Sequence, residues 1–182
     1  MSTLFDIDAP DDVAPAMTER TMLDLIHARY NVKNGVAPRY VVAEHVGLDP
    51  MWPARILDAV VADMWHSSGF AVHGIEIKVS RSDLVRELAD LSKSGSFCQH
   101  LDYFWLAVPD YRALRGLDIP QKWGVLTVAD CAPLGVHLRQ SRRAIRLRPA
   151  TRNSYHLDPL PRRVQVAMLR ATRKTYERKA EQ

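Results

Sequence analysis

The pattern of apolar and polar positions predicts an α/β protein that begins with one helix and three strands. Apolar residues recur at helical spacing after Thr18, whose side chain suits an N-cap, and Asn34-Gly35 suits the end of this helix. Runs rich in Val, Ile and aromatic residues then predict strands at 39–46, 55–65 and 70–79. The turn-forming residues His66-Ser67-Ser68-Gly69 join the last two strands, so we expect a β-hairpin there.

The second half of the chain predicts another helix, several short strands and a closing helix. Ser80 suits the N-cap of the first of these helices, and Ser94-Gly95-Ser96 predicts a break or kink in it. The closing helix has one apolar face, formed by Val164, Ala167, Met168, Ala171 and Thr175. The elements expected between the helices are strands at 102–108 and 123–128, a surface loop at 111–122, and a hairpin at 135–147 that turns at Gln140-Ser141.

These elements fit one α/β domain, with a mixed central sheet flanked by helices and a basic C-terminal helix. A chain of 182 residues is of ordinary size for one domain with its own core. Residues 1–16 are acidic and contain little to bury, so we expect a flexible leader there. The domain itself is expected at 17–150, and 151–182 should form a linker and the basic helix, packed on or extending from the same domain.

The composition is that of a soluble globular protein. Apolar residues make up 47% of the chain and charged residues 25%, and no apolar run has the length needed to cross a bilayer. The first residues carry several Asp and no Lys or Arg, the opposite of the positive start of a signal peptide. The two cysteines, Cys98 and Cys131, are isolated in the sequence, so we expect a reducing, cytoplasmic location.

Charge is distributed unevenly along the chain. Residues 139–182 contain thirteen Lys or Arg and three acidic residues, a balance of +10, whereas 1–138 has a balance of −6. A basic tail suits nucleic acid, because Lys and Arg release counterions from phosphates. A solvated helix face would explain the same run, so charge alone does not decide between the two. The candidate nucleic-acid contacts in this tail are Arg163, Arg170, Arg173 and Lys174.

An acidic and a basic residue stand on an otherwise apolar strand. In Ile75-Glu76-Ile77-Lys78-Val79 the side chains alternate, so Glu76 and Lys78 share one face while the apolar residues pack into the core. Charges are costly in such a place unless they are paired or bind a metal. An ion pair at a wet strand edge is the simpler explanation of this triplet taken alone.

Asp58 changes that interpretation, because the hairpin places it beside Glu76. A turn near Ser67 pairs residues whose numbers add to about 134, which sets Asp58 opposite Glu76. Two such carboxylates raise each other's pKa unless a divalent cation lies between them, and oxygen ligands of this kind suit Mg²⁺ or Mn²⁺. A metal held there would activate water for phosphodiester hydrolysis. Lys78 would orient that water or offset charge growing on the phosphorus.

The order of elements and three segments of the chain resemble known nucleases. The elements follow an αβββαβ order, with Asp58 on one strand and Glu76-x-Lys78 on the next. In these features the chain resembles the PD-(D/E)XK superfamily, to which restriction enzymes and many repair nucleases belong. The segments GIEIKVSRSDLVREL (followed by Lys93), LDYFWLAVPD and IPQKWGVL are similar to MmcB-like DNA repair proteins and related actinobacterial and phage nuclease-like proteins. The resemblance runs from about Glu19 to Val128 and is specific over 55–128.

The resemblance implies a restriction-endonuclease-like core and gives roles to the residues that match its motif. Asp58 and Glu76 would be the metal ligands and Lys78 the catalytic lysine, with Mg²⁺ or Mn²⁺ as the cofactor. Family members often place a further acid on the first helix, which here would be Glu19. Glu44 competes for that role, because it lies on the strand just before the hairpin.

Two further features follow from the same resemblance. Ser80, Arg81 and Asp83 match the run after the lysine, and would support the site or contact the nucleic-acid backbone. Leu57 stands where the motif has Pro, a departure that is common in the superfamily.

The expected function is therefore a metal-dependent nuclease that hydrolyses DNA phosphodiester bonds in repair, recombination or phage DNA processing. Two alternatives stay open. One is a catalytically inactive protein of the same fold that binds DNA or a protein partner, and the other is a nuclease that acts on RNA or branched DNA. The sequence also leaves open whether the protein forms a homodimer.

Overall fold

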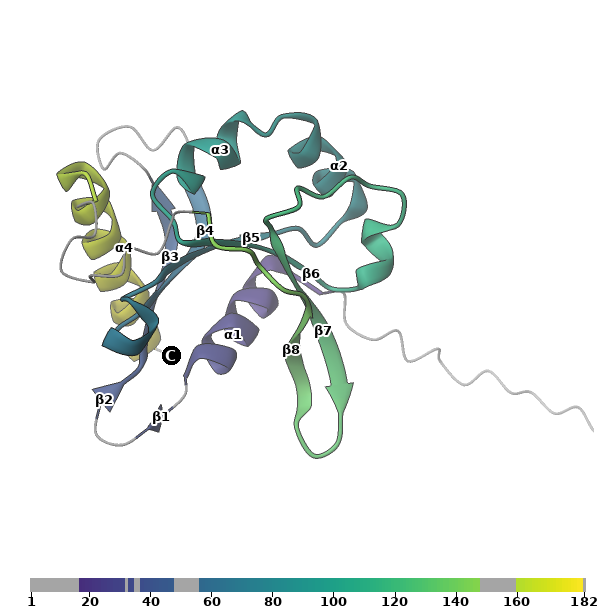
Figure 1. Cartoon of the computed structure of the whole chain (residues 1–182). Helices are drawn as coiled ribbons and strands as arrows, with labels where there is room; N and C mark the ends of the chain where they lie inside the picture. Colours follow the sequence, from purple (N-terminus) through teal and green to yellow (C-terminus); the bar gives the residue numbers. More distant parts are fainter. Residues whose placement is uncertain (1–16, 32, 35–36, 48–55, 148–159, 182) are drawn as a thin grey trace, which may run out of the picture.

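The computed structural model describes residues 17–31, 33–34, 37–47, 56–147 and 160–181 (Figure 1). Within these residues the chain is an α/β protein, with a six-stranded mixed sheet flanked by helices. The expected leader, the helix stop at Gly35 and most of the expected linker lie outside the described residues. None of the described helices is long and apolar enough to cross a membrane.

The central sheet has the spatial order β3-β4-β5-β6-β7-β8. Its three middle strands, β5, β6 and β7, are parallel, and the other neighbouring pairs are antiparallel. The strands are β3 (Tyr40–Gly47), β4 (Ile56–Asp63), β5 (Val72–Ile77), β6 (Tyr103–Val108), β7 (Gly124–Cys131) and β8 (Gly135–Arg142). The helices are α1 (Glu19–Tyr30), α2 (Arg81–Ala89), α3 (Ser92–Cys98) and α4 (Arg162–Ala180). Shorter elements are the two-stranded sheet of β1 (Lys33–Asn34) and β2 (Ala37–Pro38), and the 3₁₀ turns η1 (His66–Ser68) and η2 (Tyr111–Leu114).

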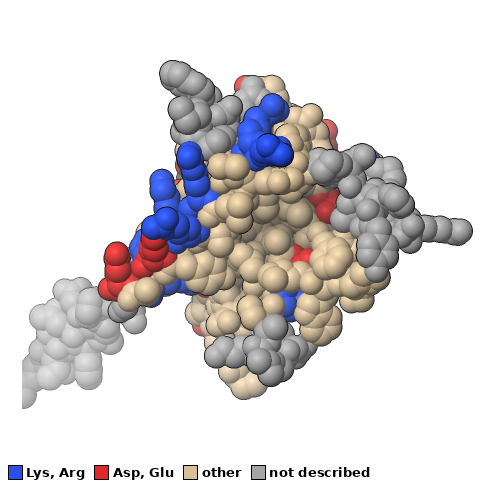
Figure 2. Space-filling model, turned by 90° about the vertical axis from the view of Figure 1, so that its left-hand side faces the viewer, with Lys and Arg blue, Asp and Glu red and all other residues tan. Residues whose placement is uncertain are grey.

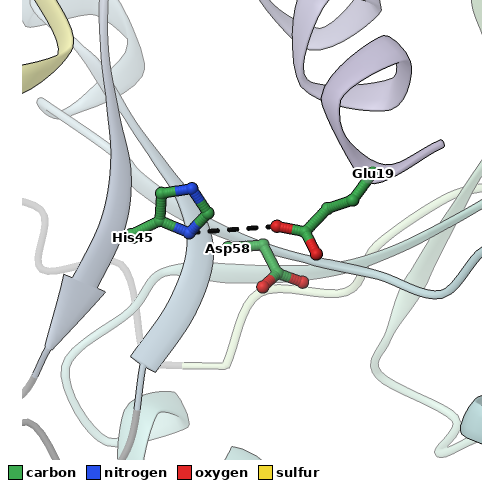
Figure 3. A group of neighbouring side chains, drawn as sticks. All are labelled: Glu19, His45 and Asp58. Atoms are coloured by element: carbon green, nitrogen blue, oxygen red, sulfur yellow. Dashed lines mark ion pairs between the residues drawn. The ribbon is translucent and has the colours of Figure 1, made fainter.

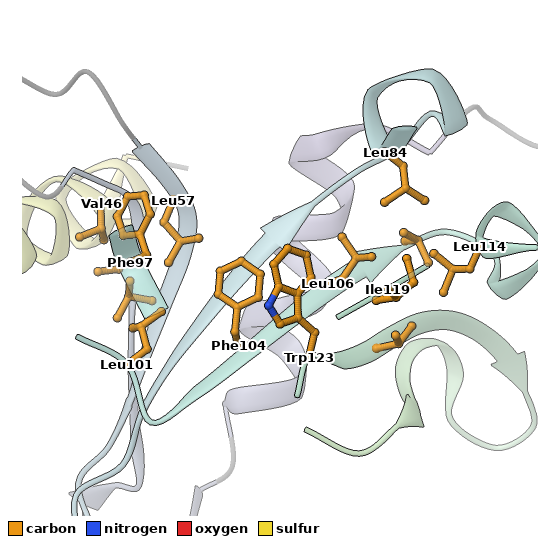
Figure 4. Packing of buried hydrophobic residues seen from close by; sticks show 14 of the residues in the cluster. Val46, Leu57, Leu84, Phe97, Leu101, Phe104, Leu106, Leu114, Ile119 and Trp123 are labelled. Atoms are coloured by element: carbon orange, nitrogen blue, oxygen red, sulfur yellow. The ribbon is translucent and has the colours of Figure 1, made fainter. Parts of the chain in front are cut away.

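Two apolar cores cover the two faces of the sheet. On one face α1 buries Met22, Leu23 and Ile26 against strand residues that include Ile75 and Ile77. On the other face Leu84 of α2 and Phe97 of α3 pack with strand residues and with the buried Leu114 and Ile119, so the expected surface loop at 111–122 is partly core (Figure 4). The sheet therefore lies between α1 and the α2–α3 pair (Figure 1).

α4 packs against β3, the edge strand of the sheet. Its buried residues are Val164, Ala167, Ala171 and Thr175, which confirms the apolar face predicted from the sequence. The backbone N–H of Glu44 donates to Thr175 Oγ1 over 2.9 Å, and this hydroxyl donates to the carbonyl of Ala171 over 2.8 Å. A side chain of α4 thus satisfies a backbone donor of the sheet edge, a group that is costly to bury unpaired.

The β4–β5 hairpin has the predicted register. Ala59 pairs with Ile75 and Val60 with Gly74, as expected for a turn centred near Ser67. The turn contains η1 and closes at Gly69, whose φ of 69° lies in the left-handed region that glycine adopts without strain. The predicted strand 70–79 is longer than β5, which ends at Ile77.

Two predicted boundaries were wrong for local reasons. α1 ends at Tyr30 rather than near Asn34, because Asn31 already caps it and its N–H donates to the carbonyl of Ala28. The helix after Ser80 breaks at Asp90, whose carboxylate accepts from the N–H of Ser92 over 2.9 Å. The predicted break, Ser94-Gly95-Ser96, lies inside α3 instead, where both serine hydroxyls donate to carbonyls of the preceding turn.

The hairpin predicted at 135–147 was also wrong. β8 runs through Gln140 and Ser141 without turning, and it pairs with β7 from Gly135 to Arg142. The turn lies instead between Cys131 and Gly135, where Pro133 and a glycine with φ of 62° supply stronger turn chemistry than Gln-Ser. The 135–142 segment therefore extends the central sheet rather than forming a separate hairpin.

A buried carboxylate joins α1, β3 and α4. Glu44 has a side chain only 1% exposed, and it accepts hydrogen bonds from Arg20 at 2.9 and 3.1 Å and from His27 Nε2 at 2.7 Å. Arg178 of α4 is a third donor to the same carboxylate. Burial on its own would raise the pKa of Glu44, but the hydrogen bonds from Arg20, Arg178 and His27 outweigh it and lower the pKa to about 2. The folded state thus favours the ionised carboxylate.

We expect Glu44→Gln to lower the free energy of unfolding by about 3 kcal/mol at neutral pH, because it removes a buried charge that three donors share. The expected loss is near the lower end for a buried ion pair, since Arg20 and Arg178 keep side chains 39% and 37% exposed. Urea denaturation would measure it. The control is Asp24→Asn, which removes an exposed partner of Arg20 and should cost about 0.5 kcal/mol or less. Equal effects of both substitutions would contradict the role given to Glu44.

The lowered pKa of Glu44 predicts that the stability difference between wild type and Glu44→Gln depends on pH. The pKa of Glu44 is lowered from 4.5 in the unfolded chain to about 2 in the fold, so its contribution is complete above about pH 4.5 and is lost as the pH falls towards 2. The stability difference between wild type and Glu44→Gln should therefore shrink over that interval. Thermal melts of both proteins at a series of pH values would show this, and a difference that stays constant would contradict it.

Candidate metal centre

The candidate centre lies where the pairing of β4 and β5 ends. Ala59 and Ile75 are the last pair, and beyond them the Asp58 carboxylate accepts a hydrogen bond from the N–H of Ile77 over 2.7 Å. β5 continues parallel to β6, and the N–H of Lys78 donates to the carbonyl of Ala107 over 3.0 Å. Asp58 therefore lies at the carboxyl end of the parallel strands, where ligand sites of open α/β sheets form.

Three side chains from three elements converge at this point (Figure 3). Glu19 begins α1, His45 lies on β3 and Asp58 on β4, and one possible ligand atom of each lies within 4.8 Å of the others. His45 Nδ1 is 3.9 Å from Glu19 Oε1, and both side chains are about half exposed, at 48% and 51%. Two carboxylates and one imidazole thus face a common, solvent-accessible point.

A local distortion of β3 accompanies the placement of His45. The pairs on either side of it in the β3–β4 ladder set His45 opposite Asp58. Its φ is 52°, in the left-handed region, which histidine enters more readily than most residues. Ala43 and Val46 pack in the same core although they are three residues apart, so the alternation of the strand reverses between them.

Glu76 and Lys78 form a second group close to Asp58. Glu76 is buried, and Lys78 Nζ donates to its Oε1 over 2.6 Å and lies 3.6 Å from the Glu87 carboxylate of α2. Burial would lower the pKa of Lys78, but Glu76, Asp58 and Glu87 outweigh burial and raise it. Lys78 is therefore positively charged at neutral pH, where it can donate hydrogen bonds but cannot act as a base.

Burial and a neighbouring carboxylate both disfavour the ionised form of Asp58. Burial is the largest cause that raises the pKa of Asp58 to about 7, and the Glu76 carboxylate adds to it. The hydrogen bond from Ile77 and the charge of Lys78 oppose the rise. Repulsion of this kind falls when a divalent cation lies among the acids.

The donor set fits a divalent cation. Carboxylates suit Mg²⁺ and Mn²⁺, and imidazole shifts the preference towards transition-metal ions over Mg²⁺. Glu19, His45 and Asp58 offer one such set from within the described residues. Binding of Mg²⁺ or Mn²⁺ to these residues stays a prediction.

The structure brings together part of the predicted site. Glu19, predicted as the further acid of the site, lies beside Asp58. Glu44, the alternative for that role, instead accepts hydrogen bonds from Arg20 of α1 and Arg178 of α4. Glu76 and Lys78 lie close by as an ion pair, and the prediction that Glu76 binds the metal stays a prediction. His45 and Glu87 were missed. The β3–β4 register would have indicated His45, because the pairs Glu44–Ala59 and Val46–Leu57 set His45 opposite Asp58.

The residues predicted after the lysine have structural contacts. Ser80 caps α2, since its hydroxyl accepts from the N–H of Asp83 over 3.1 Å. Arg81 donates to the carbonyls of Ala113 and Arg115, which anchors the segment around η2. Contact of Ser80 or Arg81 with nucleic acid stays a prediction.

His73 is a core histidine. Its ring stacks on Tyr103 with centroids 4.9 Å apart, and its Nδ1 accepts from the indole N–H of Trp105 over 3.1 Å. Burial is the main cause that lowers the pKa of His73 to about 4, so the ring is neutral at physiological pH. These contacts explain His73 without a role in the candidate centre.

Comparison with known proteins adds little to this description. No protein-family model matches the chain, and no curated protein matches it. One solved structure, described as SPO1766, a protein of unknown function from Silicibacter pomeroyi, is similar with a TM-score of 0.49 and 16% sequence identity. The similarity covers 79% of this chain and 78% of that one.

We expect His45→Ala to weaken Mn²⁺ binding by about tenfold or more and Mg²⁺ binding by less, because imidazole favours transition-metal ions. Isothermal titration calorimetry with each ion would measure both affinities. His137→Ala is the matched control, since it removes a half-buried histidine of β8 that lies outside the converging group. Unchanged Mn²⁺ affinity in His45→Ala would remove His45 from the ligand set.

Proposed function

We propose that this protein is a metal-dependent nuclease of the PD-(D/E)XK type that hydrolyses phosphodiester bonds of DNA. The observation that supports this proposal most is the convergence of Glu19, His45 and Asp58 beside the Glu76–Lys78 pair. Carboxylates that hold a divalent cation, next to a protonated lysine, are the groups that phosphodiester hydrolysis needs.

The topology is compatible with a restriction-endonuclease-like core. The elements α1, β3, β4, β5, α2–α3 and β6 follow the αβββαβ order. Asp58 lies on the second strand of the hairpin series and Glu76 on the third, with β6 parallel to the third. This order supports the proposal, because the resemblance of the sequence implies Asp58 on one strand and Glu76 and Lys78 on the next.

In this proposal some residues of the centre bind the metal ion, and Lys78 offsets negative charge on the phosphate. Glu19, His45 and Asp58 would hold Mg²⁺ or Mn²⁺, with Glu76 as a further ligand if Lys78 yields its hydrogen bond. The ion, when bound, supplies a polarised phosphate oxygen and a water of lowered pKa. Lys78 would donate to the phosphate or to the attacking water, and Glu87 would keep Lys78 in position.

One observation favours a second candidate, a catalytically inactive protein of this fold that binds nucleic acid or a protein partner. Lys78 forms a close ion pair with Glu76, 2.6 Å long, and Glu87 lies 3.6 Å away on its other side. Lys78 thus has acidic partners without substrate or metal, as a structural ion pair would. RNA or branched DNA as the substrate also stays open, because the centre recognises only the phosphodiester.

We expect Asp58→Asn to abolish metal-dependent cleavage and to weaken Mn²⁺ binding, while the protein stays at least as stable as wild type because repulsion with Glu76 is relieved. Lys78→Ala should abolish cleavage but leave Mn²⁺ affinity near that of wild type. The assays are nuclease reactions on duplex, single-stranded and branched DNA and on RNA, with Mg²⁺, Mn²⁺ or EDTA, and calorimetry with Mn²⁺.

Asp118→Asn and Lys122→Ala are the controls, since both remove exposed charges of the same kind between η2 and β7. They should cleave and bind metal like wild type. A wild-type protein that binds no divalent ion and cuts none of these substrates would overturn the nuclease proposal and favour the inactive binding protein.

A further inference from the structure

A groove with a basic wall runs between α4 and β3. Its volume is about 440 Å³, and its α4 wall contains Arg170, Lys174 and Arg178. These three residues are spaced by four, so they form one row along the helix, about 6 Å apart along its axis. Figure 2 shows the side of the molecule that carries α4, where Lys and Arg gather in a band. The facing wall is formed by Glu44, His45, Gly47 and Ile56.

The basic residues of this part of α4 differ in whether they form ion pairs. Arg178 is bound to Glu44, so it holds α4 against the sheet. Arg170 and Lys174 are exposed and make no ion pair with another described residue. Arg173, by contrast, is paired with Glu177 over 2.6 Å and is not a lining residue of the groove. The two cations available to a ligand are therefore Arg170 and Lys174.

The one acid in the groove wall does not oppose an anionic ligand. The Glu44 carboxylate is 1% exposed and accepts from Arg20, His27 and Arg178, so its charge is compensated inside the protein. The floor between the cations contains Ala167 and Ala171, whose small side chains leave room for a chain to lie along α4. The described walls of the groove thus carry a net positive charge.

The groove also reaches the candidate metal centre. His45 lines it and is at the same time one of the three converging side chains with Glu19 and Asp58. A ligand that lies along Arg170 and Lys174 therefore passes the imidazole of His45 on its way to the two carboxylates.

We propose that the α4–β3 groove binds the sugar–phosphate backbone of the nucleic acid and directs it to the Glu19–His45–Asp58 centre. This inference rests on the proposed nuclease function and specifies its substrate path. A backbone with a charge on every nucleotide can contact both exposed cations, Arg170 and Lys174, and still extend to the centre, whereas a small anion cannot span the row. Arg170 and Lys174 contact phosphates, which lack sequence information, so binding through them is independent of sequence.

The test is the double substitution Arg170→Gln/Lys174→Gln in the full-length protein, with Arg163→Gln/Arg173→Gln as the matched control. All four residues are candidate nucleic-acid contacts of the tail by sequence, but only Arg170 and Lys174 line the groove. Both pairs remove two positive charges from exposed positions of α4, so the comparison separates the groove from the other two candidates. Fluorescence anisotropy in EDTA would measure binding of labelled duplex DNA, single-stranded DNA and RNA over a range of salt concentrations. Circular dichroism would verify that both variants are folded.

The groove pair should weaken binding by about tenfold or more near 0.1 M salt, and should lower the salt slope by about 1.8 for duplex or about 1.4 for a single strand. The control pair should leave the slope within about 0.5 of wild type. Equal losses from both pairs would assign binding to the overall charge of α4 and overturn the groove, as would unchanged binding in the groove pair. Because binding is measured in EDTA, a protein that binds through the groove but never cleaves would keep this inference and refute only the nuclease function. A protein that cleaves, and whose groove variant binds nucleic acid normally, would support the nuclease function and refute the groove.

Discussion

The buried carboxylate of Glu44 is the interaction on which the arrangement of this protein depends. It accepts hydrogen bonds from α1 through Arg20 and His27 and from α4 through Arg178, while its own backbone N–H donates to Thr175 of α4. A buried charge is costly unless its partners are fixed, so each of these elements is held to β3 at one place.

The ion cluster and the candidate centre are neighbours in the sequence as well as in space. Glu19 precedes Arg20, and His45 follows Glu44, so the hydrogen bonds of Glu44 fix the backbone directly beside two of the three converging side chains. On α4, Lys174 lies one turn before Arg178, so the same carboxylate also fixes the wall of the basic groove. One structural interaction thereby positions both the candidate ligands and the cations that lead to them.

The sequence predicts those parts of this arrangement that follow from periodicity and turn chemistry. The β4–β5 hairpin follows from the turn at 66–69, and its register brings Asp58 towards Glu76 with no knowledge of the fold. His45 could not be found by alternation, because its φ of 52° reverses the faces of β3 at that residue. Glu87 is a helix residue whose approach to Lys78 depends on how α2 packs, and the passage of β8 through Gln140 depends on pairing with β7. Tertiary contacts, not local propensity, decide these features.

The charges around Asp58 explain why a bound cation would stabilise this group of side chains. Glu19, Asp58, Glu76 and Glu87 are four carboxylates, and Lys78 is the cation that pairs with two of them. Lys78 donates to Glu76 and lies 3.6 Å from Glu87, whereas Glu19 and Asp58 form a separate group with His45, whose possible ligand atoms lie within 4.8 Å of one another. A structural ion pair needs no such excess of acid, whereas a divalent ion offsets two negative charges at one point. The contrast between the Glu76–Lys78 ion pair and the Glu19–His45–Asp58 group is therefore the physical reason why the proposed metal would lie on the side of Asp58.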